Sequence, residues 1–133
     1  MIGPAHHVGI AVEHLDLAIE RYQALGLVLD YTEDVPSAGV RVAFLKAGAV
    51  HVELVEPLDP SGPVARFLAK RGEGLHHIAF STRDIVGELA RLEEEGFELV
   101  DRAPRPGARG RTVAFLQPRS AHGVLIELVQ EPV

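Results

Sequence analysis

Two histidines and two glutamates of this sequence stand in matched contexts and could together bind a metal ion. His7 lies in the segment HHVGIAV, and His77 lies in the similar segment HHIAFS, 70 residues later. Glu53 lies in VELV and Glu127 in IELV, 74 residues later. A carboxylate buried among apolar residues is costly unless a cation balances it, and imidazole with carboxylate suits Co²⁺, Ni²⁺, Zn²⁺, Fe²⁺ or Mn²⁺. The four residues therefore predict one divalent metal site.

These matched residues belong to an internal repeat that covers most of the chain. The sequence VAFL occurs at 42–45 and at 113–116, and each copy has an amphipathic stretch that ends at Gly26 or Gly96. Each copy is typical of the order strand, helix, strand, strand, strand. We predict an α+β fold with two tandem βαβββ modules that form a curved sheet around a metal-containing cleft. The chain would be a single domain, residues 1–133, with modules at 5–58 and 74–133 and a linker at 59–73 that holds a short helix.

Side-chain alternation along the predicted strands places the candidate ligands on one face of each module. His7 faces the cleft, whereas the bulky residues of the first strand lie under the helix. His51 shares the parity of Glu53, and the pattern leaves open whether it faces the cleft. We expect His6 and His76 on the opposite face. The first helix, at residues 16–25, is expected to place four residues near one face: Leu17, Ile19, Tyr22 and Leu25.

Composition and charge exclude several classes of protein. The net charge of −6 argues against a partner that is a nucleic acid, because such binders normally carry a basic excess. The absence of cysteine excludes a disulfide framework, a Cys-ligated zinc site and a thiol nucleophile. No apolar run approaches a membrane span and no signal peptide is recognisable, so we expect a cytoplasmic protein without a membrane partner. A basic cluster includes Arg105, Arg109 and Arg111, which could bind the phosphates of a small molecule or form a solvated loop.

The chain resembles the methylmalonyl-CoA epimerase family of the vicinal oxygen chelate superfamily. The resemblance is carried by HVGIAV, VELVEPL, GLHHIA, the GARG loop with VAFL, and GVLIEL, and it runs nearly end to end. It implies two βαβββ modules, a homodimer and an acyl-CoA substrate. It also implies a divalent metal at the positions of His7, Glu53, His77 and Glu127, for which we expect Co²⁺ ahead of Mn²⁺, Ni²⁺, Zn²⁺ or Fe²⁺. One departure is Val42, which stands where some members have a carboxylate proposed as a base.

The implied reaction interconverts the 2R and 2S forms of methylmalonyl-CoA through an enolate. A proton must leave one face of the α-carbon and return to the other, which needs an acid/base group on each face. Glu53 and Glu127 are the candidates, and Arg105, Arg109 and Arg111 are candidates for contacts with CoA. Two alternatives remain open: another metal enzyme of the superfamily, either a glyoxalase-like isomerase or a dioxygenase, and a non-enzymatic binding protein of the same fold.

Overall fold

The computed structural model describes residues 1–133, which form two compact units. His7–His76 make the N-terminal unit, and His77–Val133 together with Met1–His6 make the C-terminal unit. None of the helices combines the length and the apolar character needed to cross a bilayer.

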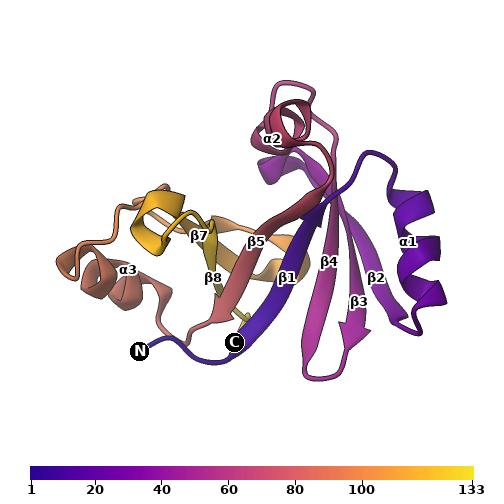
Figure 1. Cartoon of the computed structure of the whole chain (residues 1–133). Coiled ribbons are helices and arrows are strands. Elements are labelled where there is room, and N and C mark those ends of the chain that lie inside the picture. Colours follow the sequence, from indigo (N-terminus) through magenta and orange to yellow (C-terminus); the bar gives the residue numbers. More distant parts are fainter. The chain divides into compact units, whose positions relative to one another are not determined.

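The N-terminal unit has one helix on one face of a four-stranded sheet (Figure 1). Its strand order is β2-β3-β4-β1, with β1 parallel to β4 and the other neighbours antiparallel. A second helix follows the last strand, and β1 begins within the residues assigned to the other unit. The elements are β1 (Ala5–Ala11), α1 (Leu15–Ala24), β2 (Val28–Val35), β3 (Val40–Ala47), β4 (Val50–Pro57) and α2 (Pro63–Arg71).

The C-terminal unit repeats this arrangement, and its last three strands are shorter than their counterparts. Its strand order is β5-β8-β7-β6, with β5 parallel to β8. The elements are β5 (Gly74–Ser81), α3 (Ile85–Glu94), β6 (Arg105–Pro106), β7 (Thr112–Leu116) and β8 (Ile126–Gln130). The predicted α+β class and the two βαβββ modules are therefore confirmed, whereas the boundaries of a single domain stay a prediction.

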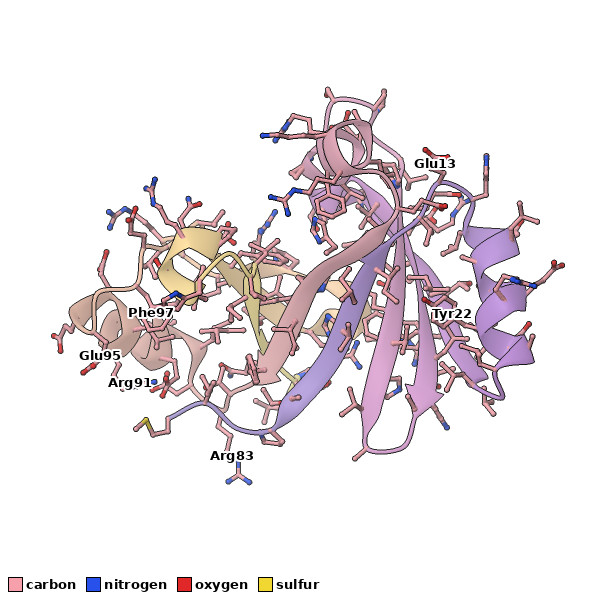
Figure 2. The ribbon with its side chains drawn as sticks, viewed as in Figure 1. Glu13, Tyr22, Arg83, Arg91, Glu95 and Phe97 are labelled. Atoms are coloured by element: carbon pink, nitrogen blue, oxygen red, sulfur yellow. The ribbon has the colours of Figure 1, made fainter.

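Helix α1 packs on its sheet through residues spaced three and four apart, the period of one helical face. Leu15 is buried, and Tyr22, labelled in Figure 2, packs against the same core between α1 and the strands. The prediction for Leu17 and Leu25 was wrong, because these side chains are 61% and 75% exposed. Leu17 is two positions from Leu15 and so points away from the sheet, and Leu25 follows the last residue of α1.

The repeat extends to the start of each helix. The Glu56 carboxylate accepts a hydrogen bond from Leu15 N, and the Gln130 side-chain oxygen accepts one from Ile85 N, both at 2.8 Å. Helix α3 has a further cap, because Asp84 Oδ1 accepts a hydrogen bond from Gly87 N at 3.0 Å. These contacts tie each helix to the strand that carries the candidate glutamate three residues earlier.

Candidate metal centre

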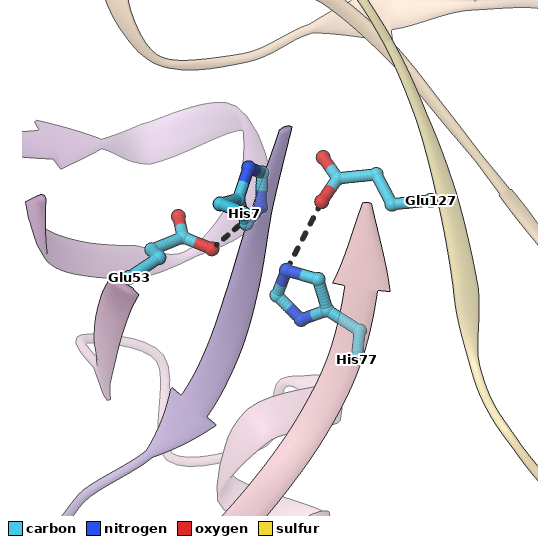
Figure 3. A group of neighbouring side chains, drawn as sticks. All are labelled: His7, Glu53, His77 and Glu127. Carbon is cyan, nitrogen blue, oxygen red and sulfur yellow. Dashed lines mark ion pairs between the residues drawn. The ribbon is translucent and has the colours of Figure 1, made fainter. Parts of the chain in front are cut away.

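In the N-terminal unit, two neighbouring parallel strands bring His7 and Glu53 together. Gly9 of β1 is the register partner of Glu53 on β4, so alternation puts His7 on the same face of the sheet. His7 is 3% exposed and Glu53 is 9% exposed. His7 Nε2 lies 3.2 Å from Glu53 Oε1, and Figure 3 marks this pair with a dashed line.

The C-terminal unit builds the same pair from the equivalent strands. Ala79 of β5 is the register partner of Glu127 on β8, which places His77 on the face of Glu127. Both side chains are buried, and His77 Nε2 lies 3.0 Å from Glu127 Oε1 (Figure 3). Each predicted histidine is thus brought beside its predicted glutamate.

The spacing within each pair suits two ligands of one metal ion. Metal–nitrogen and metal–oxygen bonds of about 2.1 Å, set at a right angle, place the two ligand atoms about 3.0 Å apart. The observed separations of 3.2 Å and 3.0 Å match this geometry. Because an imidazole nitrogen and a carboxylate oxygen are good ligands for divalent transition metals, each pair fits half of a four-ligand set.

A phenyl ring stands beside each pair. Phe44 is the register partner of Glu53, and its ring contacts His7 edge to face at 5.2 Å between centroids. Phe115 is the register partner of Glu127, and its ring contacts His77 in the same way at 5.7 Å. These rings keep water from one side of each pair, which strengthens electrostatic interactions there.

The structure places His51 on the same face as His7, a point that the sequence pattern left open. The two residues are register partners, and the Phe44 ring contacts both imidazoles. His51 Nε2 lies 3.0 Å from Asp30 Oδ2. The sequence gives no sign of Asp30, because this residue falls where the register of β2 shifts, between Leu29 and Tyr31. Simple alternation fails at such an irregularity.

The other strand histidines have partners of their own. His6 Nε2 lies 2.7 Å from Glu131 Oε2. The ring of His76 contacts Phe67 of α2 edge to face, at 4.9 Å between centroids. These contacts agree with the expectation that His6 and His76 do not belong with His7 and His77.

The three candidate arginines have different surroundings. Arg111 Nε donates to Glu131 Oε2 at 2.8 Å. Burial acts to raise the pKa of Glu131, but hydrogen bonds from His6 and Arg111 outweigh it and leave that pKa below its ordinary value. Arg109 is exposed and has a φ of 56° in the turn between β6 and β7. Arg105 lies over the Phe115 ring, with its guanidinium carbon 5.4 Å from the ring centroid.

Comparisons with known proteins agree with this site. The profile of the Glyoxalase/Bleomycin resistance protein/Dioxygenase superfamily matches residues 6–115. The chain is 45% identical over 125 residues to the uncharacterised protein YqjC of Bacillus subtilis, covering 93% of this chain and 89% of the relative. It is 38% identical over 133 residues to ethylmalonyl-CoA/methylmalonyl-CoA epimerase of Cereibacter sphaeroides, covering 98% and 99%. A solved structure of methylmalonyl-CoA epimerase in complex with methylmalonyl-CoA and NH4+ superposes with a TM-score of 0.95 at 38% identity, covering 100% of this chain and 97% of that one.

Proposed function

The chain belongs to the Glyoxalase/Bleomycin resistance protein/Dioxygenase superfamily, and from this premise we propose that it interconverts the 2R and 2S forms of methylmalonyl-CoA. The carrying observation is a buried His–Glu pair at equivalent places in both units of a chain that matches known epimerases over nearly its whole length. The proposed enzyme is an isomerase of the epimerase class, with an acyl-CoA substrate.

We propose that His7, Glu53, His77 and Glu127 hold one divalent cation. The support is the ligand spacing within each pair, the burial of all four side chains and the repeat that relates the pairs. Two neutral imidazoles and two carboxylates balance the charge of such an ion. Co²⁺ is the proposed metal, ahead of Mn²⁺, Ni²⁺, Zn²⁺ or Fe²⁺, all of which accept this donor set.

The proposed chemistry follows from the acidity of the substrate α-proton, which lies between a thioester and a carboxylate. Its removal gives a planar enolate, and a proton returned to the opposite face completes the epimerisation. The cation would supply charge stabilisation for the oxygen on which negative charge develops. Glu53 of the N-terminal unit and Glu127 of the C-terminal unit act as the acid/base groups, while Phe44 and Phe115 exclude water from the pairs.

The proposed substrate contacts are Arg105, Arg109 and Arg111. Arg109 is exposed, so its guanidinium is the one that we direct to the phosphates of CoA. The enzyme is a homodimer, as its resemblance to the family implies, and light scattering coupled to gel filtration measures this directly. The cytoplasm is the compartment proposed for it.

Proton exchange tests the proposed reaction. The purified protein, loaded with Co²⁺, is incubated with methylmalonyl-CoA in D2O, and NMR follows loss of the α-proton signal. We expect rapid loss together with interconversion of the epimers. A protein that binds Co²⁺ but exchanges no α-proton is another metal enzyme of the superfamily, and this result would refute the epimerase proposal.

Metal analysis tests the ligand set separately. His77→Ala should lose bound metal and activity together, since it removes one of four ligands. His14→Ala is the matched control, because His14 is an exposed histidine at the start of α1 whose side chain makes no capping hydrogen bond. Full metal occupancy of His77→Ala, measured by elemental analysis, would remove His77 from the site.

A further inference from the structure

We propose that Arg105 binds the free carboxylate of the substrate and thereby selects thioesters that carry one. The inference deepens the proposed function and rests on it, since it names what the site recognises in the acyl group. It separates Arg105 from Arg109 and Arg111 and assigns it to the acyl part of the substrate instead of the CoA phosphates.

Arg105 lies on the face of the C-terminal unit that carries the His77–Glu127 pair. On β6 it is the register partner of Val113 of β7, and Phe115 lies two residues further along β7 on the same face. Phe115 is the register partner of Glu127 and contacts His77. The Phe115 ring therefore contacts both the guanidinium of Arg105 and the imidazole of His77.

The guanidinium of Arg105 lies beside the Asp101 carboxylate, but its Nε makes no hydrogen bond. Asp101 Oδ2 accepts from Phe115 N at 2.8 Å, and Asp101 Oδ1 lies 3.3 Å from Arg105 Nε. Arg105 Nε is buried, yet it has no hydrogen-bond partner, so its contact with Asp101 is an ion pair with poor hydrogen-bond geometry. A ligand carboxylate on the terminal nitrogens would use the planar fork that such groups fit.

Neighbouring arginines differ in this respect. Arg111 donates to Glu131, and exposed Arg102 donates to Glu93 at 3.2 Å. Arg119 likewise donates through its Nε to Glu98, at 2.9 Å. These three guanidiniums are therefore already bonded to carboxylates of the protein. Arg105 differs from them because its Nε lies 3.3 Å from Asp101 Oδ1 without a hydrogen bond, and because it lies on the face of the His77–Glu127 pair.

The position of Arg105 favours a carboxylate on the acyl group over a phosphate of CoA. A thioester whose reacting carbon lies at the His77–Glu127 pair has its carboxylate one bond from that carbon. Its phosphates lie beyond the long pantetheine arm. Because Arg105 and His77 contact the same Phe115 ring, we place the guanidinium at the acyl group and not at the far end of that arm.

The test compares two thioesters that differ in the carboxylate. Calorimetry on the metal-loaded protein measures the Kd of methylmalonyl-CoA and of propionyl-CoA, which lacks the carboxylate. We expect Arg105→Gln to raise the Kd of methylmalonyl-CoA about 10- to 100-fold, the range for a hydrogen bond to a charged group, and to leave that of propionyl-CoA unchanged. Arg105→Lys, which keeps the charge but not the fork, should show a smaller loss with the same selectivity.

Controls distinguish a binding role from a structural one. Arg102→Gln removes an exposed arginine of the same loop and should change neither Kd. Equal weakening of both thioesters by Arg105→Gln would place Arg105 at the CoA moiety and overturn the proposal, as would no change in either Kd. If Arg105→Gln does not fold, the same two measurements on Arg105→Lys decide the matter. Proton exchange by the parent protein is measured independently, so failure of the epimerase assignment is distinguished from failure of this one.

Discussion

Glu53 and Glu127 each lie against one histidine of their own unit. Replacing either glutamate with glutamine separates metal binding from proton transfer. The amide oxygen of glutamine can still bind a metal, but it cannot accept the α-proton. We expect Glu53→Gln and Glu127→Gln to keep metal and to impair α-proton exchange from opposite epimers. Each pure epimer is incubated with each variant in D2O, and NMR follows the exchange.

The informative outcome is the behaviour of Glu53→Gln. Exchange of both epimers at the parental rate would leave Glu53 as a ligand only. His51 would then be the next residue to replace, because it lies on the same face and is held by Asp30.

The proposed contact of Arg109 with the CoA part of the substrate can be tested by kinetics. Arg109→Gln should raise KM several-fold with little change in kcat, since an exposed cation contributes to binding but not to the chemical step. The effect should shrink as salt increases, because salt screens exposed charges. Steady-state kinetics at low and high ionic strength measure both effects, and a KM that equals the parental value at low salt would remove Arg109 from the binding site.

The metal-ligand candidates could be predicted from sequence because they lie in regular strands, where alternation fixes the face of each side chain. His7 and Glu53 illustrate this, as both fall within uninterrupted registers. Asp30 could not be placed, since it lies at a register shift. The environment of Arg105 was equally hidden, because β6 has two residues and gives no periodic signal.

At the scale of single elements, the cap of α3 is a local source of stability that lies apart from the chemistry. Asp84→Ala removes the acceptor for Gly87 N and should cost about 1 kcal/mol, or about 4 °C in Tm. Epimerase activity at low temperature should stay near the parental value. Differential scanning calorimetry measures the shift. The repeat-equivalent His14→Ala is the control and should leave Tm unchanged, because His14 provides no such bond.

Helix α3 also carries a buried carboxylate that links stability to pH. Hydrogen bonds from Arg91, and then from the Met1 ammonium, hold the pKa of Glu88 below its ordinary value. Because the pKa of Glu88 is lower in the folded than in the unfolded state, the ionised Glu88 carboxylate stabilises the fold at pH values above its unfolded-state pKa. This contribution is lost as the pH falls through the folded-state pKa. Glu88→Gln should therefore lower Tm at pH 7 and flatten the decline of Tm on acidification. Parallel curves for parent and variant would contradict this role.

The ends of the helices could be predicted from glycines, and the strands from their apolar patterns. Which face of a helix is buried could be predicted less well. Gly26 and Gly96 end their helices with positive φ, as expected of glycine there. The buried face of α1 was misjudged because Leu17 and Leu25 are apolar yet exposed. An exposed leucine carries no sequence mark that distinguishes it from a core leucine, so only the packed structure decides.

At the scale of the whole molecule, the proposed metal should contribute to stability, because an ion that binds only the folded chain shifts unfolding by mass action. Co²⁺ at 100 times its Kd should stabilise the protein by about 2.7 kcal/mol and raise Tm accordingly. A chelator should reverse the shift, and His7→Ala should abolish it. A Tm that responds equally to Co²⁺ in parent and His7→Ala would mean that the ion binds elsewhere.

The two units repeat the same donors but surround them differently. The ring of Phe44 is stacked on Tyr31 at 4.9 Å in the N-terminal unit, whereas that of Phe115 carries the guanidinium of Arg105 in the C-terminal unit. Two copies of one module in separate, identical chains would have to carry the same side chain beside both phenyl rings. Because the two copies are parts of one chain, the tyrosine and the arginine are independent of each other. The surroundings of Phe115 therefore carry a positive charge that the surroundings of Phe44 do not have to share.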